Sequence, residues 1–226
     1  MTTKTLFVAG AHTEIGKTWV ACALLRAARA EGLSVAAAKP VVSGFDEARW
    51  ADSDPGRLLA ACGAELTPPA LDEISPWRYQ APVAPPSAAR LEARALPFSE
   101  VVAYARQRVS TSGANLMVVE AVGGLMSPFA DGATSLDLMT AIGGPNVLVV
   151  GSYLGAVSHG LTALEVLRAR QLRPAALVVS ERGAADDLPL EGTLALLREH
   201  VRDPPVIGAP THSCDWARAV LTLSSN

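Results

Sequence analysis

The chain has 226 residues, of which 50% are hydrophobic and 18% are charged, and its formal net charge is −3. This length and composition suffice to bury one large core, and we expect a single α/β domain over residues 1–226. The acidic balance and the scattered arginines argue against nucleic acid as a partner. Because no apolar run reaches about 18 residues and no signal segment precedes the first strand, we expect no membrane association.

Three cysteines, Cys22, Cys62 and Cys214, lie far apart and form no C-x-x-C pair. An odd number of isolated cysteines is typical of a reducing compartment. We therefore expect a cytoplasmic protein with buried, free thiols.

A short apolar run at 5–9 leads into a loop that reads A-x-x-x-x-G-K-T from Ala11, and a helix is predicted from 17 to about 30. This is the pattern of a phosphate-binding loop. Gly16 lets backbone N–H groups surround a phosphate, Lys17 adds a positive charge, and the Thr18 hydroxyl can ligate Mg²⁺. A glycine turn that only starts a helix is the weaker interpretation.

Strands and helices alternate along the rest of the chain. The strands are nearly continuous Val, Leu and Ala runs, which indicates burial on both faces of a parallel sheet. We predict an α/β fold like that of P-loop NTPases, with helices on both faces of the sheet. Further strands are expected at 33–38, 116–119, 146–150, 175–179 and 206–207, and further helices at 55–62, 98–109, 135–142, 157–170, 187–200 and 213–222.

Two segments are harder to interpret. Residues 41–56 have the composition of a polar loop. Residues 67–89 are rich in Pro and Ala, which suits either a linker or a rigid loop beside a pocket.

Ionisable residues stand at or near the ends of predicted strands, where ligands of parallel sheets bind. Lys39 ends the second strand and Glu120 the third, and Asp54 follows in the loop after Lys39. Lys39 is either a surface charge or a phosphate contact, and Glu120 suits a magnesium ligand. Asp54 suits a further oxygen ligand or a helix N-cap.

The ordered set of strand-end motifs resembles the dethiobiotin synthetase family over roughly residues 4–210. Each motif alone is weak, but their order is specific. The motifs are Gly10-Ala11-His12-Thr13-Glu14-Ile15-Gly16-Lys17-Thr18, Lys39-Pro40-Val41-Val42-Ser43-Gly44, Ser53-Asp54, Glu120-Ala121-Val122-Gly123-Gly124 and Leu154-Gly155-Ala156-Val157-Ser158-His159.

The resemblance implies an ATP-dependent ligase of biotin biosynthesis. It would use ATP, Mg²⁺ and CO₂ to close the ureido ring of dethiobiotin from 7,8-diaminopelargonate. It would also be a homodimer with its substrate site at the subunit interface.

The resemblance also implies a role for each matching residue. Lys17 and Lys39 would flank the transferred phosphoryl group, and Thr18, Asp54 and Glu120 would hold Mg²⁺. We expect Lys39→Ala to abolish turnover and leave the fold intact. Nucleotide contacts would come from Glu14, Ile15, Gly16, Lys17, Thr18, Trp19, Asp54, Glu120, Gly123 and Ser180, and substrate contacts from Thr13, Ser43, Gly123, Gly155, Ala156, Val157 and Ser158.

Several positions depart from the family pattern. His12 replaces Asp or Gly in the loop, Ser158 replaces Asn, and Ala121 replaces a glycine beside the nucleotide, which questions close backbone approach there. The Asn-Asp pair that recognises adenine is Ser180-Glu181 here. Because a serine lacks the paired donor and acceptor of an amide, we hypothesise relaxed base selectivity.

Other classes share the P-loop. A partition ATPase usually has a second lysine where this chain has His12, and a glutamine-dependent amide ligase would need more than 226 residues. A kinase of a small metabolite remains compatible with the spacing, and a structural protein is the least favoured alternative.

Overall fold

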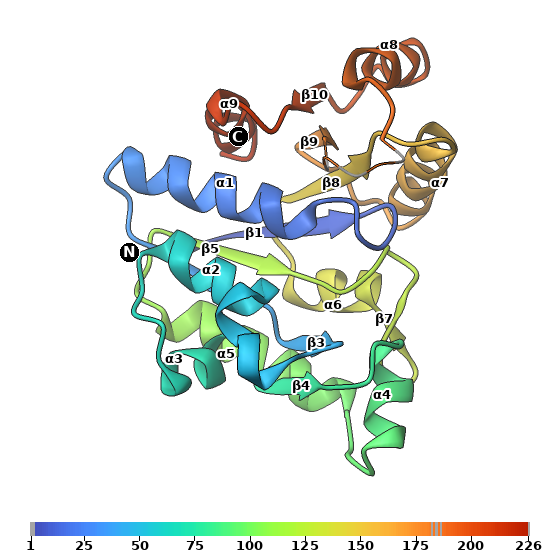
Figure 1. The fold of residues 1–226 in the computed structure, drawn as a ribbon. Coiled ribbons are helices and arrows are strands. Elements are labelled where there is room, and N and C mark those ends of the chain that lie inside the picture. Colours follow the sequence, from blue (N-terminus) through green and yellow to red (C-terminus); the bar gives the residue numbers. More distant parts are fainter. Residues whose placement is uncertain (1–2, 182, 184, 186, 226) are drawn as a thin grey trace.

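Six parallel strands form the central sheet of the computed structural model, which describes residues 3–181, 183, 185 and 187–225 (Figure 1). Their order is β10-β9-β8-β1-β5-β2, and their parallel pairing agrees with the parallel sheet predicted from the buried apolar runs. Strand β1 lies inside the sheet with β5 on one side and β8 on the other, so its carboxyl end is a topological switch point where ligands bind. The bounds are β1 (Lys4–Gly10), β2 (Val35–Ala38), β5 (Leu116–Glu120), β8 (Asn146–Gly151), β9 (Ala176–Ser180) and β10 (Val206–Ala209).

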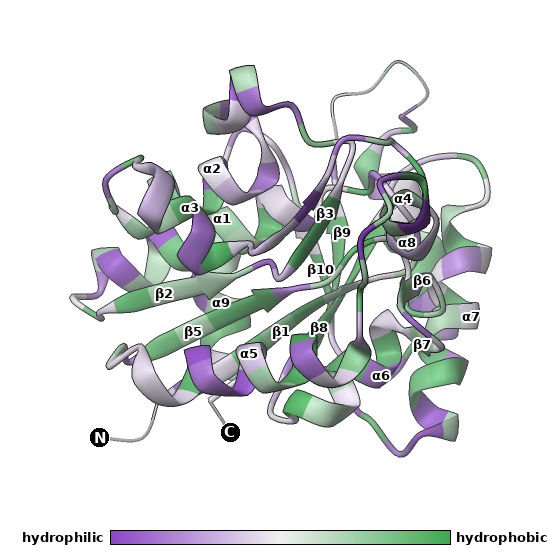
Figure 2. Ribbon diagram, turned by 90° about the horizontal axis from the view of Figure 1, so that it is seen from below, coloured by the Kyte–Doolittle hydropathy of each residue, from purple (hydrophilic) through white to green (hydrophobic). Residues whose placement is uncertain are grey.

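Helices cover both faces of this sheet, and each face has its own core. Along β1, Leu6 and Val8 pack into one core, and Phe7 and Ala9 pack into the other. This alternation follows from the two-residue period of a strand. Figure 2 shows the central strands in the green of hydrophobic residues. Helices α1 (Lys17–Ala30), α2 (Asp54–Cys62), α3 (Pro68–Ile74) and α9 (Asp215–Leu223) contribute to the first core, and α5 (Phe98–Thr111), α6 (Ser135–Ile142), α7 (Ala156–Ala169) and α8 (Leu190–His200) to the second.

The segment 41–56 is more ordered than its polar composition predicts. Its first residues form β3 (Val41–Ser43), which pairs in parallel with β4 (Trp77–Tyr79), and a 3₁₀ helix, η1 (Glu47–Asp52), follows. The β-branched pair Val41-Val42 favours a strand once Trp77–Tyr79 supplies a partner. That partner lies more than thirty residues away, so the local pattern could not reveal the pairing.

The Pro- and Ala-rich segment 67–89 is also structured. Prolines occupy the first turns of α3 and of α4 (Pro85–Leu91), where a missing N–H costs no helical hydrogen bond. The linker interpretation of 67–89 is therefore wrong.

A small hairpin, β6 (Pro128–Ala130) with β7 (Ala133–Thr134), was not predicted.

The three cysteines differ in how exposed they are. The expectation of buried thiols is correct for Cys22, but Cys62 is partly exposed and Cys214 is exposed. Cys214 precedes the first turn of α9, where the chain runs over the surface. Over the residues described, none of the helices has both the length and the apolar composition needed to cross a bilayer.

Candidate active site

The loop between β1 and α1 has the conformation of a phosphate-binding loop. Gly16 adopts a left-handed backbone with φ of 87° and forms the N-cap of α1 without a side-chain hydrogen bond. A Cβ at this position would lie 2.2 Å from Ser180 Oγ, so only glycine fits. The first N–H groups of α1 and the positive end of its dipole are thus directed toward an anion site.

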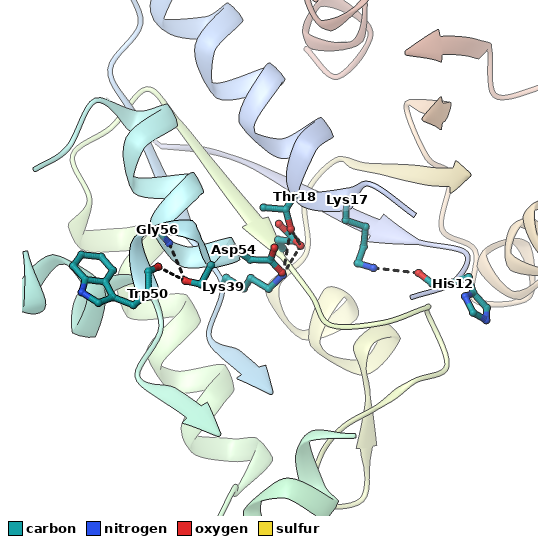
Figure 3. A network of polar contacts seen from close by, with 9 residues as sticks. His12, Lys17, Thr18, Lys39, Trp50, Asp54 and Gly56 are labelled. Atoms are coloured by element: carbon teal, nitrogen blue, oxygen red, sulfur yellow. Dashed lines mark hydrogen bonds and ion pairs between the residues drawn. The ribbon is translucent and has the colours of Figure 1, made fainter. Parts of the chain in front are cut away.

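Four side chains beside this loop form one connected group, which we call the Lys39 cluster: Lys39, Asp54, Glu120 and Thr18. Lys39 Nζ donates to Asp54 Oδ2, to Glu120 Oε1 at 2.6 Å and to Thr18 Oγ1 at 3.4 Å. Thr18 Oγ1 donates to Glu120 Oε1 at 2.7 Å. Figure 3 shows Lys39, Asp54 and Thr18 pointing toward one another. The structure thus brings together residues predicted from four separate motifs.

Sheet register explains why Lys39 and Glu120 meet. Strands β2 and β5 are neighbours, and their register pairs Ala38 with Val119. The next residue on each strand therefore leaves the sheet side by side with its partner. Asp54 reaches the same point from the first turn of α2, which begins after the N-cap Ser53. Its position was predicted, but its ion pair with Lys39 was not.

Burial and charge set the protonation of the Lys39 cluster. Burial lowers the pKa of Lys39, but the nearby charges of Glu120 and Asp54 outweigh burial and raise its pKa above the usual value. Burial raises the pKa of Asp54, but Lys39 overcomes that effect and holds it below the usual value. Burial dominates at Glu120 and raises its pKa, which Lys39 offsets only in part. Lys39 is therefore a permanent cation held between two carboxyl groups.

Lys17, the second lysine predicted for the site, is directed into the phosphate loop. Lys17 Nζ donates to the backbone oxygen of His12 at 3.1 Å, inside the loop (Figure 3). Burial lowers the pKa of Lys17 to about 8, with Glu120 acting in the opposite direction. A bound phosphate would supply the negative charge that this desolvated ammonium lacks.

One cavity of about 710 Å³ joins the phosphate loop and the Lys39 cluster. Most predicted site residues line it: Thr13, Glu14, Ile15, Gly16, Lys17, Thr18, Trp19, Lys39, Ser43, Asp54, Glu120 and Gly123. Five others do not, namely Ser180, Gly155, Ala156, Val157 and Ser158. A second cavity, of about 750 Å³ between α7 and α8, contains none of the predicted residues.

Several lining residues were not predicted as site residues. Residues 82–85 form one wall, which agrees with the interpretation of 67–89 as a rigid loop beside a pocket. Arg57 lies one helical turn after Asp54 and was detectable from that spacing. Glu181 and Thr211 line the cavity after β9 and β10, and no local motif marked Thr211. Ala121 does not line the cavity, because its methyl group is buried in the core.

The oxygen atoms of the Lys39 cluster fit a magnesium ion. Glu120 Oε2 is buried and has no hydrogen-bond partner among the residues that the structure describes, so a ligand atom is available beside the Thr18 hydroxyl and Asp54. The residues that the structure describes hold no group of three or more His, Cys, Asp or Glu side chains that could bind a metal. Mg²⁺ needs no such cage, since it commonly uses one or two carboxylates, water and substrate phosphates.

Comparison with known proteins gives both a family and a fold. A family model described as an AAA domain matches residues 4–209. The "ATP-dependent dethiobiotin synthetase BioD" of Caulobacter vibrioides is 54% identical over 207 residues, covering 92% of each chain. The protein of the same name from Phenylobacterium zucineum is 50% identical over 215 residues, covering 95% of this chain and 92% of that one.

Solved structures agree with the architecture. The hydrogenase maturation factor HypB from Archaeoglobus fulgidus superposes with a TM-score of 0.56 at 14% identity, covering 99% of this chain and 89% of that chain. The signal recognition particle receptor FtsY from Elizabethkingia anophelis gives 0.53 at 14% identity, covering 98% and 65%. At such identity these likenesses concern the fold alone.

The parallel sheet, the phosphate loop and the neighbouring solved structures define a P-loop NTPase-like α/β protein. The solved structures share the fold at 14% identity, whereas the two dethiobiotin synthetases are 50% and 54% identical to this chain over nearly its whole length. Such identity indicates membership of one family. The chain belongs to the dethiobiotin synthetase family and is an ATP-dependent ligase of biotin biosynthesis.

Proposed function

We propose that the protein uses ATP, Mg²⁺ and CO₂ to convert 7,8-diaminopelargonate into dethiobiotin, ADP and phosphate. The observation that carries this proposal is the convergence of Lys39, Asp54, Glu120 and Thr18 in the cavity of the phosphate loop. A P-loop that only switches between nucleotide states does not need a second buried lysine at the end of β2. In a ligase that activates an anionic substrate with ATP, a second buried lysine can neutralise the negative charge of that substrate.

The reaction would proceed in three steps. One substrate amine adds to CO₂, which forms a C–N bond and, after loss of a proton, a carbamate. A carbamate oxygen then attacks the γ-phosphorus and releases ADP, which gives a carbamic–phosphoric anhydride. The second amine attacks the anhydride carbon, closes the ring, loses its proton and expels phosphate.

The carbamate, the anhydride and the phosphates all carry negative charge, so charge neutralisation and positioning would dominate the catalysis. Lys17 would contact the transferred phosphoryl group from the loop, and Lys39 would face the carbamate and the same phosphoryl group. Thr18, Asp54 and Glu120 would hold Mg²⁺, which supplies Lewis-acid neutralisation of the phosphates. Thr13 and Ser43 line the same cavity and would contact the carbamate or the diamine.

We also propose that the active form is a homodimer. The turn Gly155–Ser158 opens α7 and does not line the cavity of its own subunit. Its N–H groups would instead bind the substrate carboxylate in the partner subunit's site. Light scattering after size-exclusion chromatography tests this, and a monomer at the concentrations used for activity would exclude it.

The test of the reaction is phosphate release from ATP with Mg²⁺ and bicarbonate, with and without 7,8-diaminopelargonate, followed by mass analysis of the product. Diamine-dependent phosphate with one equivalent of dethiobiotin is the expected result. Hydrolysis that is independent of the diamine would instead favour a nucleotide switch. A phosphorylated product in place of free phosphate would identify a kinase.

A further inference from the structure

Among the residues that the structure describes, three positively charged side chains line the cavity, and two of them already have partners. Lys39 lies between two carboxyl groups, and Lys17 Nζ donates to the backbone oxygen of His12. The third is Arg57, which is exposed. Its guanidinium makes neither an ion pair nor a hydrogen bond within the described part of the chain. The charge of Arg57 is thus available to an anion in the cavity.

Helix α2 holds Arg57 beside the phosphate loop. Arg57 follows Asp54 by one helical turn, and its backbone oxygen accepts from Cys22 Sγ at 3.4 Å, which ties α2 to α1 (Figure 1). The start of α2 is closely packed, because a Cβ at Gly56 would lie 2.4 Å from the backbone oxygen of Ala51. A long helical side chain lies over the preceding turn, which here is the turn that carries Asp54. We therefore expect the guanidinium to reach the cavity beside Asp54.

The phosphates of a nucleotide are a suitable partner for this side chain. A nucleoside diphosphate or triphosphate keeps a net negative charge after it has bound one Mg²⁺. A planar guanidinium can donate two parallel N–H bonds to two phosphate oxygens. Gly56, the residue before Arg57, and Lys17 lie on opposite sides of Thr18 (Figure 3). Positive charge would therefore reach the phosphates from both sides.

We propose that Arg57 binds the phosphates of the nucleotide from α2. The proposal rests on phosphates that lie in this cavity, which the proposed function also requires. An Arg57 variant should bind the nucleotide more weakly without a change in the free energy of unfolding. The reason is that the side chain is exposed and pairs with no carboxylate of the described residues.

Titration calorimetry of the full chain with Mg²⁺ and ADP tests this proposal without turnover. Arg57→Gln should weaken ADP binding by about tenfold, a typical effect of losing one charge-assisted hydrogen bond. Arg57→Lys keeps the charge but lacks the planar pair of donors, so its affinity should fall between those of the wild type and Arg57→Gln. Pyrophosphate has neither base nor ribose. It should displace ADP from the wild type, and Arg57→Gln should weaken its binding by a similar factor.

Arg26→Gln on the exposed side of α1 makes the same charge change outside the cavity and serves as the matched control, with unchanged affinities expected. Wild-type affinity in Arg57→Gln would overturn the proposal, and so would an equal loss in Arg26→Gln. Urea denaturation should give Arg57→Gln the stability of the wild type. A fall in stability that accompanies the loss of affinity would instead indicate a structural role.

Pyrophosphate separates a phosphate contact from other contacts. A loss of affinity for ADP alone would contradict the proposal, because Arg57 would then contact the base or the ribose. Pyrophosphate that fails to displace ADP from the wild type would also contradict it, because the phosphates alone would then have no binding site. A wild type that binds neither ligand would overturn the proposed function as well. The expected losses without dethiobiotin formation would remove only the proposed reaction.

Discussion

Lys39 Nζ lies 2.6 Å from Glu120 Oε1, and the other oxygen of Glu120 has no hydrogen-bond partner. The Lys39 side chain is 4% exposed and that of Glu120 is fully buried. A carboxyl group in this position depends on the neighbouring ammonium of Lys39, since its side chain is fully buried. The same pair that would serve phosphoryl transfer therefore also contributes to the stability of the fold.

Replacing Lys39 by Met should destabilise the protein as well as abolish turnover. It leaves Glu120 and Asp54 facing each other without a counter-charge, and removing one partner of a buried pair costs about 3–5 kcal/mol. The loss should be near the lower end, because the Asp54 side chain is 39% exposed and partly screened by solvent. Urea denaturation gives the free energy of unfolding.

The matched control for Lys39→Met is the double variant with Glu120→Gln, which removes the unpaired charge and should recover part of the lost stability. The expectation from sequence that Lys39→Ala leaves the fold intact stays a prediction, to which the buried ion pair adds a lower free energy of unfolding. A Lys39→Met protein as stable as the wild type would show that the buried carboxyls are neutral or solvated.

Gly16→Ala should abolish nucleotide binding. Its Cβ would lie 2.2 Å from Ser180 Oγ, and its φ of 87° is unfavourable for alanine. Gly32→Ala is a matched control, because Gly32 has a similar φ of 80° but open space around a Cβ. It should cost only about 1 kcal/mol of stability and leave nucleotide affinity unchanged. Calorimetric titration with ADP compares the two, and equal losses in both would mean that backbone strain alone is responsible.

Thr18→Val should raise the Mg²⁺ concentration needed for half-maximal activity by at least about tenfold. It removes the hydroxyl that donates to Glu120 Oε1 at 2.7 Å and that would contact the metal. Thr18→Ser keeps the hydroxyl and should remain close to the wild type. Titration of activity with MgCl₂ at saturating ATP gives both values, and identical midpoints for Val and Ser would remove Thr18 from the metal site.

The three cysteines should react with iodoacetamide at very different rates at pH 8. Burial raises the pKa of Cys22 to about 12 and that of Cys62 to about 11, so both are thiols at this pH. Cys214 is exposed and should be alkylated first. Raising the pH increases the thiolate fraction of Cys62 before that of Cys22, so Cys62 should follow. Peptide mass spectrometry over time measures the order, and early labelling of Cys22 would contradict its burial.

The elements that could be predicted are those with local signals. Helix α6 occupies the predicted residues 135–142, because an apolar run there begins at a Thr134 and Asp137 capping box. Strand β3 could not be predicted, because its partner, Trp77–Tyr79, is remote in sequence and has no strand-like run of its own. A rigid loop beside a pocket was one of two interpretations of segment 67–89, and residues 82–85 form that wall. The sequence left both open, because a proline-rich composition restricts the backbone dihedral angles but does not say where the segment lies in the fold.

Hydrophobic runs and motif spacing are local or ordered along the chain, so they were enough to predict the parallel sheet, the phosphate loop and the family. The contacts between side chains of different strands became visible only in the folded structure. The register of β2 and β5 places Lys39 beside Glu120, and the carboxyl ends of β9 and β10 bring Thr211 to Glu181. These contacts depend on sheet order and register. Both arise from the packing of segments that are distant in sequence, so local sequence patterns do not predict them.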